Sequence, residues 1–220
     1  MQPRLMTDYH PPAAPLEVLY QDQTLVFVNK PSGLLSVPGK PAAHWDCLEY
    51  RVREAIPNAL LIHRLDLETS GVIVFARTPE AQRHLNRQFE RRQVEKVYVA
   101  RVTGEVAGEE GAIDLPLIAD WPRRPMQKVC HETGKSARTH WRVAEREARA
   151  TRLILCPETG RSHQLRVHLK EIGHPILGDP FYAPEPIYRA ADRLQLHAQS
   201  LGLHHPEGGH WLVVEAPAPF

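Results

Sequence analysis

The chain has 220 residues, of which 42% are hydrophobic and 24% are charged, and its 27 basic and 26 acidic residues leave a net charge of +1. A chain of this length can bury a core that needs no disulfide or metal, and its balanced charge excludes a surface that is basic all over. The three cysteines, Cys47, Cys130 and Cys156, lie far apart, which argues against a disulfide framework and against a thiolate metal site.

Residues 1–15 contain four prolines and little periodic apolar content, so we expect them to form a flexible arm. They lack the apolar core of a signal peptide, and no run in the chain approaches the roughly 18 apolar residues of a membrane span. The sequence therefore predicts a cytoplasmic protein with no membrane contact. Residues 16–220 show no linker and no repeat, and we expect a single domain there.

The first half of that span predicts strands, loops and two helices. Thr78-Pro79 is a typical cap-then-proline start of a helix, and Ala81, Leu85 and Phe89 form its inward stripe. Asp46 is the expected cap of the other helix. The predicted elements are strands at 16–20, 24–30, 60–63 and 71–77, a Pro- and Gly-containing loop at 30–39, and helices at 46–56 and from 79 onwards.

The second half is richer in strands. One segment switches to a helical period and ends at Gly173, a typical C-terminal cap residue. The predicted elements are strands at 95–104, 126–132, 136–147, 150–157, 194–203 and 210–217, and a helix at 159–173. This order predicts an α+β fold with a central mixed, mostly antiparallel sheet flanked by helices and loops.

The stretch HRLDLETSGVIVFA at 63–76 concentrates the residues best suited to chemistry, because a basic pair and Asp66 precede an apolar strand. Taken alone, Asp66 could simply be a carboxylate that caps a loop. A second motif, TGRSHQLRVH at 159–168, places Arg161 and Arg166 near a predicted helix N-terminus, where anions are favoured. Arg166 is therefore a candidate partner for a carboxylate.

Two other functions can be weighed from local patterns. His63-Arg64-Leu65-Asp66 resembles the HRD triplet of protein kinases, but the chain has no GxGxxG loop, VAIK-like strand or DFG motif. The spacing of the histidines, including His163 and His168, matches no zinc pattern. We therefore expect neither kinase chemistry nor a metal site.

Several motifs carry a resemblance to a known family. They are VNKPSGLLSVPG at 28–39, HRLDLETSG at 63–71, KVYVARV at 96–102, DLPLIADWPRRPMQKVCHETGK at 114–135, TGRSHQLRVH at 159–168 and GHPILGDPFYA at 173–183. In these segments the chain resembles the RluA-type pseudouridine synthases, and the resemblance implies the catalytic fold of that family. Other branches carry an S4 RNA-binding domain ahead of this fold, and we expect no S4 domain here.

The resemblance also implies roles for individual residues. Asp66 matches the catalytic aspartate, Arg64 its neighbour, Tyr98 the tyrosine that packs against uracil, and Arg166 the partner of the aspartate. Arg166 would keep Asp66 ionised and orient it through two-pronged hydrogen bonds that a lysine cannot reproduce. The expected substrate-binding residues are His63, Arg161, His163, Gln164, His168, Arg123, Arg124 and Lys128.

The implied reaction breaks the N-glycosidic bond of a flipped-out uridine, turns the uracil and rejoins it through carbon, with no metal or cofactor. Whether Asp66 attacks the sugar or removes a proton from it stays open. The implied partners are a tRNA anticodon stem-loop and a 23S rRNA hairpin, and we expect a monomer. Two rival functions are a non-catalytic RNA-binding or folding factor and a glycoside or nucleoside hydrolase that uses Asp66, for which Glu68 would be the nearest second carboxylate.

Overall fold

The computed structural model of the protein describes residues 9–220 and forms two compact units. The terminal unit comprises residues 9–96 and His197–Pro219, and the central unit comprises Val97–Leu196 and Phe220. The single domain expected over 16–220 stays a prediction. Within the described residues, no helix has the length and apolar character needed to cross a membrane.

The terminal unit is built on a sheet in which the strand order is β1-β2-β4-β11, with β3 added to β4 and β12 to β11. The β4–β11 pair is parallel, and the other pairs are antiparallel. The strands are β1 (Glu17–Gln21), β2 (Leu25–Lys30), β3 (Leu60–Leu61), β4 (Ser70–Ala76), β11 (Leu196–His204) and β12 (Trp211–Glu215).

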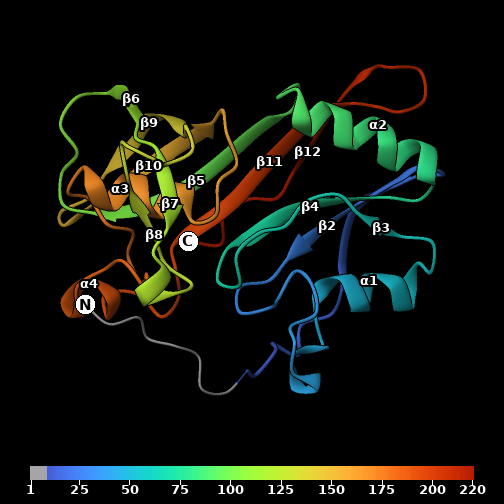
Figure 1. Cartoon of the computed structure of the whole chain (residues 1–220), viewed down its shortest axis with the longest axis horizontal. Coiled ribbons are helices and arrows are strands. Elements are labelled where there is room, and N and C mark those ends of the chain that lie inside the picture. Colours follow the sequence, from blue (N-terminus) through green and yellow to red (C-terminus); the bar gives the residue numbers. More distant parts are fainter. Residues whose placement is uncertain (1–8) are drawn as a thin grey trace. The chain divides into compact units, whose positions relative to one another are not determined.

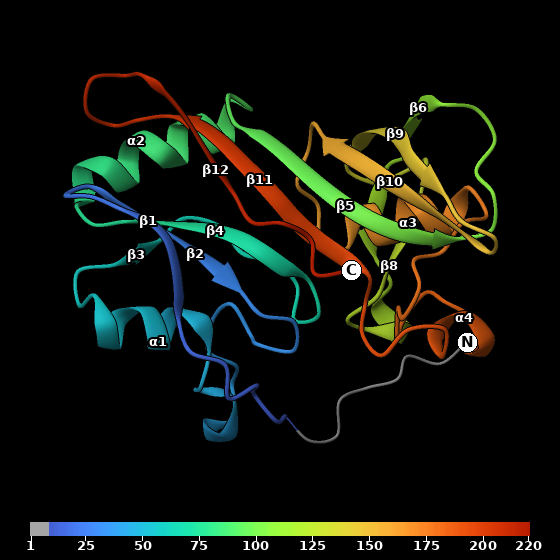
Figure 2. The same cartoon turned by 180° about the vertical axis from the view of Figure 1, so that it is seen from behind.

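Helices α1 (Leu48–Ala55) and α2 (Pro79–Glu90) lie on opposite sides of these strands (Figures 1 and 2). Leu85 of α2 packs in one core cluster with Phe27 of β2 and Val74 of β4. Every residue of β4 is buried. Because neighbouring side chains of a strand point to opposite faces, a strand covered on both faces needs the continuous apolar run seen in the sequence.

The helix starts in this unit show which caps form. Thr78 caps α2 as expected, since its hydroxyl oxygen accepts a hydrogen bond from the Ala81 N–H at 3.1 Å. The predicted Asp46 cap of α1 is wrong. Cys47 is the residue before that helix, and the Asp46 carboxylate instead binds the Arg51 guanidinium in two-pronged geometry at 2.6 and 2.8 Å. The Asp46 carboxylate therefore pairs with the charged side chain of Arg51 instead of capping the helix. The 3₁₀ turn before the helix spans Ala42–His44.

Part of the predicted N-terminal arm, residues 1–8, lies outside the described residues. Tyr9 is buried, and its hydroxyl donates to the Asp46 carbonyl at 2.8 Å and accepts from the Leu35 N–H at 3.0 Å. Arg51 donates to the carbonyls of Pro12 and Ala14. Flexibility of the arm stays a prediction, and these contacts count against it for residues 9–15.

The central unit has an antiparallel sheet in the order β5-β10-β9-β6, together with a separate hairpin of β7 and β8. Helix α3 covers one face of the sheet, because Leu165 and Leu169 join the core cluster of Ala100 and Leu153. The elements are β5 (Glu95–Thr103), β6 (Glu110–Asp114), β7 (Leu117–Ala119), a 3₁₀ turn (Trp121–Arg123), β8 (Gln127–Val129), β9 (Arg138–Arg146), β10 (Ala150–Pro157), α3 (Gln164–Glu171) and α4 (Glu185–Tyr188).

Helix α3 is shorter than the predicted 159–173. His163, directly before it, has a left-handed backbone with φ of 53°, which stops the helix from extending towards Thr159. The C-terminal end is as expected, with Gly173 at φ of 87° and the His174 N–H donating to the Leu169 carbonyl at 2.9 Å. The predicted α+β fold with a mostly antiparallel mixed sheet is confirmed.

Candidate active site

Asp66 lies in the loop between β3 and β4, and Lys30 holds this loop in place. The Lys30 side chain is completely buried, and its ammonium donates to the carbonyls of Pro31, Leu34 and Leu67 at 3.0, 2.6 and 2.8 Å. The last of these acceptors directly follows Asp66 in the chain. A buried ammonium without hydrogen-bond acceptors would be very costly, so three carbonyls around one cation form a firm clamp.

The loop at 30–39 adds further contacts to the Asp66 loop. The Ser36 hydroxyl donates to the Leu65 carbonyl at 2.6 Å and accepts from its N–H at 3.1 Å. The Ser32 hydroxyl donates to the Glu68 carbonyl, and the Gly33 N–H donates to the Leu67 carbonyl. Because both sides of Asp66 are held through the backbone, its partly exposed side chain projects from a fixed point.

His63 and Arg64, which precede Asp66, face different surroundings. The His63 ring stacks on Phe89 at 4.9 Å, and its Nε2 accepts from the Val74 N–H at 3.2 Å. Burial, with a smaller effect of the Lys96 ammonium, lowers the pKa of His63 from 6.5 to about 3, so the ring is neutral at pH 7. Arg64 is exposed. His63 thus attaches the loop to β4 and α2, whereas Arg64 lies at the surface.

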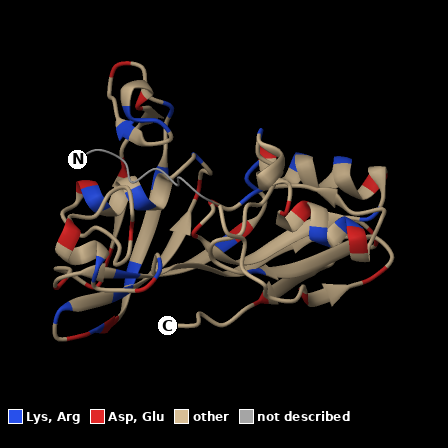
Figure 3. Cartoon of the chain, turned by 90° about the horizontal axis from the view of Figure 1, so that it is seen from below, with Lys and Arg blue, Asp and Glu red and all other residues tan. Residues whose placement is uncertain are grey.

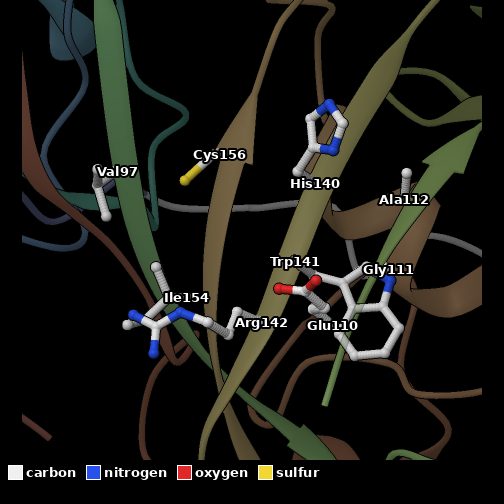
Figure 4. A pocket seen from close by; sticks show the side chains of 9 residues that line it. All are labelled: Val97, Glu110, Gly111, Ala112, His140, Trp141, Arg142, Ile154 and Cys156. Atoms are coloured by element: carbon white, nitrogen blue, oxygen red, sulfur yellow. The ribbon is translucent and has the colours of Figure 1, made fainter. Parts of the chain in front are cut away.

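Tyr98 lies on β5 of the central unit, partly exposed and packed against the cluster of Ala100 and Leu153. Its neighbour Val97 points to the other face of the sheet, where a hollow of about 730 Å³ lies (Figure 4). The hollow is lined by Val97, Glu110, Gly111, Ala112, His140, Trp141, Arg142, Ile154 and Cys156. None of the predicted catalytic residues lines it, so we do not assign the active site to this hollow.

Arg166 is buried on α3, and its two-pronged partner within the central unit is Asp179. The Nε and Nη2 atoms donate to Oδ2 and Oδ1 of Asp179 at 2.8 and 2.7 Å. The two side chains are only 2% and 0% exposed. This geometry uses the side edge of the guanidinium, which carries three further N–H groups on Nη1 and Nη2. The pairing of Arg166 with Asp66 stays a prediction, because Asp66 belongs to the terminal unit.

Aromatic rings complete the surroundings of Arg166. Its guanidinium carbon lies 5.0 Å from the ring centre of Phe181 and 5.1 Å from that of Tyr182. The Tyr182 hydroxyl is 2.7 Å from Nδ1 of His163 and accepts from the Gln127 N–H at 2.8 Å. The α3 N-terminus, the segment after Asp179 and the β8 strand therefore meet at one tyrosine.

Two of the predicted RNA contacts satisfy their polar groups inside the protein. The Gln164 amide accepts from Thr159 and Arg161 and donates to Arg138 and Thr139. His168 is completely buried, with its two ring nitrogens 3.0 Å from the Thr139 hydroxyl and the Leu115 carbonyl, and burial lowers its pKa. Gln164 and His168 are therefore not part of the RNA-binding surface that we propose.

The remaining predicted contacts are at or near the surface. Arg161 is partly exposed and donates from Nε to the Ser136 carbonyl. Arg123, Arg124 and Lys128 lie exposed around the β7–β8 hairpin, where Arg123 pairs with Asp120 at 2.6 Å. Basic and acidic segments are interspersed along the rest of the chain (Figure 3). A basic surface on this protein is therefore local, as the near-zero net charge implied.

Sequence reasoning missed three residues of interest. Lys30 and Asp179 stand inside the quoted motifs, but their partners become visible only once the chain is folded. Trp121 is 66% exposed at the hairpin tip, and the Arg124 guanidinium lies over its ring. An exposed tryptophan beside two arginines was a readable signal for nucleic-acid stacking. In the described residues, no group of three or more His, Cys, Asp or Glu side chains could hold a metal ion.

A family model matches most of the chain. The family model described as RNA pseudouridylate synthase matches residues 24–171, which include the Asp66 loop, Tyr98 and Arg166. The chain belongs to the RNA pseudouridylate synthase family. This match places Asp66, Tyr98 and Arg166 within the segment that defines the family, while Asp179 lies beyond it.

Relatives of this family member cover nearly the whole chain. It is 54% identical over 98% of its length to the dual-specificity RNA pseudouridine synthase RluA of Salmonella typhi, covering 99% of that protein. It is 55% identical over 92% of its length to the enzyme of the same name from Yersinia pestis, covering 99% of it.

Solved structures show the same fold. The human RNA pseudouridylate synthase domain containing 1 matches with a TM-score of 0.81 and 27% identity, over 96% of this chain and 87% of that one. The human RNA pseudouridylate synthase domain containing 4 matches with a TM-score of 0.75 and 26% identity, over 92% of this chain and 88% of that one. The pseudouridine synthase fold expected from the sequence is therefore confirmed.

Proposed function

We propose that this chain isomerises uridine to pseudouridine at two kinds of site, a tRNA anticodon stem-loop and a hairpin of 23S rRNA. The observation that supports two substrates is the 54% identity, over 98% of the chain, to a relative described as a dual-specificity enzyme. Both proposed RNAs present the target in a loop, where a base can be splayed out and read. We also propose that the enzyme acts on these RNAs in the cytoplasm.

Asp66 is the proposed catalytic residue. The clamp of Lys30 on the adjacent Leu67 carbonyl fixes where its carboxylate projects, which is what attack on a sugar carbon or removal of a sugar proton requires. The exposed Arg64 occupies the space that the flipped uridine leaves in the RNA. Tyr98 offers a flat ring to the uracil, and base–aromatic stacking contributes about 1–3 kcal/mol.

The β7–β8 hairpin binds the RNA. Arg123, Arg124 and Lys128 bind phosphates, and Trp121 stacks on an unpaired base with the ring face that Arg124 does not cover. Each phosphate contact makes affinity fall with salt. The dissociation constant for a stem-loop should therefore rise steeply between about 50 and 200 mM salt. A flat salt response would remove the phosphate contacts from the proposal.

The decisive experiment incubates the protein with a uridine-containing anticodon stem-loop. Pseudouridine formation leaves the mass unchanged and gives a product that reacts with a carbodiimide. The wild type should form this product, and Asp66→Asn should not. Glu68→Gln is the matched control, because it removes a carboxylate two residues along the same loop. Release of free uracil with loss of activity in both variants would indicate a hydrolase instead.

Two milder variants test the roles of the partner residues. Arg166→Lys should fold and lose at least about 100-fold in single-turnover rate, because an ammonium cannot reproduce the guanidinium edges. A wild-type rate would remove Arg166 from the mechanism.

Tyr98→Phe keeps the ring and loses the hydroxyl, so an unchanged rate would restrict Tyr98 to stacking.

A further inference from the structure

The buried pair of Arg166 and Asp179 calls for a functional explanation. Both side chains are withdrawn from water, with exposures of 2% and 0%. A buried ion pair usually contributes little net stability, because desolvation of two charges offsets their attraction, and apolar residues of similar volume often serve as well. What such a pair does supply is a fixed geometry.

That geometry is unusually complete. One carboxylate oxygen of Asp179, Oδ1, accepts from Arg166 and also from the N–H groups of Phe181 and Tyr182 at 2.8 and 3.1 Å. The carboxylate is therefore held by backbone before it binds the guanidinium. The rings of the same two residues lie about 5 Å from the guanidinium carbon. Arg166 can neither rotate nor slide without breaking several contacts.

We propose that Asp179 is a positioning residue, which holds the side edge of the Arg166 guanidinium so that its end-on edge is presented to the catalytic carboxylate. This inference rests on the proposed function, in which that carboxylate belongs to Asp66. The end-on edge consists of one N–H each from Nη1 and Nη2, and it can form a second two-pronged pair. Asp179 sets the direction in which the edge points, and it does not touch the RNA.

Asp179→Asn tests the proposal. The substitution keeps the size of the side chain, and its amide oxygen can still accept from the Phe181 and Tyr182 N–H groups. Its amide nitrogen, however, is a donor that faces a donor of Arg166, so the side-on pair is lost. The single-turnover rate on a saturating tRNA anticodon stem-loop should fall on the order of 100-fold, as expected for a misplaced catalytic partner. The dissociation constant for the stem-loop should stay within about threefold, since positioning does not alter RNA binding.

A double variant separates positioning from a general structural role. If Asp179 acts through Arg166, then adding Asp179→Asn to Arg166→Lys should lower the rate by no more than about threefold beyond Arg166→Lys alone. Multiplicative losses, or a wild-type rate for Asp179→Asn, would overturn the proposal. Glu147→Gln is the matched control. It breaks the side-on pair of Glu147 with Arg101 in the same unit, and its rate should stay within about twofold of wild type.

A second variant covers the case in which Asp179→Asn does not fold. Asp179→Glu keeps the negative charge and the ion pair, but its extra methylene displaces the guanidinium. Its rate should fall at least about tenfold with RNA affinity unchanged, and a wild-type rate would refute the positioning role. Asp66→Asn is measured in parallel. If Asp66→Asn is active, the proposed function fails, whereas an inactive Asp66→Asn beside a fully active Asp179→Asn overturns only this inference.

Discussion

Lys30→Met is the sharpest test of how the Asp66 loop is held. The variant keeps the length of the side chain and removes three hydrogen bonds, to the carbonyls of Pro31, Leu34 and Leu67. Leu67 retains the Gly33 N–H as a donor. The other two carbonyls lose their charged donor, at about 1–3 kcal/mol each. Because a buried ammonium no longer has to be desolvated, part of that loss is offset.

We expect a net loss of about 3 kcal/mol, which is roughly a 150-fold change in the folding equilibrium and a Tm decrease of about 6–12 °C for a chain of this size. Urea titration at pH 7 measures the loss. Lys40→Met is the control, since that lysine is exposed and directly follows the loop at 30–39 in the chain, and it should change stability by less than about 0.5 kcal/mol.

Hydrogen exchange locates the effect. The Gly33 and Thr69 N–H groups donate to the carbonyls of Leu67 and Asp66, so both should exchange faster in Lys30→Met than in Lys40→Met. Isomerisation should slow as well, because the Asp66 loop, which we propose to be catalytic, is no longer fixed. A Lys30→Met protein with wild-type stability and unchanged exchange at these two amides would refute the clamp.

Four further variants test the fold and its pH dependence. Gly71→Ala should cost at least about 4 kcal/mol by denaturant titration, because Gly71 has φ of 116° and a Cβ there would lie 2.2 Å from the Ala198 carbonyl oxygen. Gly173→Ala, at φ of 87° with open space around it, should cost only about 1–2 kcal/mol. Equal losses would refute the steric argument. Thr78→Ala should cost about 1 kcal/mol through the lost α2 cap, again by denaturant titration, and no change would remove the cap. The lowered pKa of His63 means that the unfolded chain takes up a proton near pH 6.5 while the folded protein does so only near pH 3. Stability should therefore fall as the pH is lowered through that range, and more steeply than in His63→Gln; equal slopes in urea titrations at pH 7, 6 and 5 would refute this.

Signals carried by neighbouring residues were readable from the sequence. The apolar run of β4, the Thr78 cap and the Gly173 end of α3 all depend on residues within one or two turns of each other. The motif around Asp66 was readable for a similar reason, because crowded charges before an apolar strand are a local pattern. Such features form largely as their sequence dictates, whatever the rest of the chain does.

Features that depend on which partner a charged side chain takes in the folded chain were not readable. Asp46 looked like a helix cap, but the nearby Arg51 is a stronger, charged partner for it. The clamp of Lys30 on Leu67 joins residues that are 37 positions apart. Asp179 was part of a quoted motif, and nothing in that motif shows that its carboxylate binds Arg166. A carboxylate chooses its partner by geometry in the folded chain, which spacing along the sequence does not fix.

The Asp179 pair also changes how Arg166 should act on a catalytic carboxylate. At an effective dielectric constant of 20, a carboxylate about 4 Å from the guanidinium is attracted by about 4 kcal/mol, whereas the Asp179 charge on the adjacent edge, about 7 Å away, repels it by about 2.4 kcal/mol. Roughly half of the attraction is cancelled. What remains undiminished is the direction of the two N–H groups of the end-on edge. A lysine would face the same cancellation without offering two rigid edges, so the sequence-based expectation that lysine cannot replace Arg166 rests on orientation more than on charge.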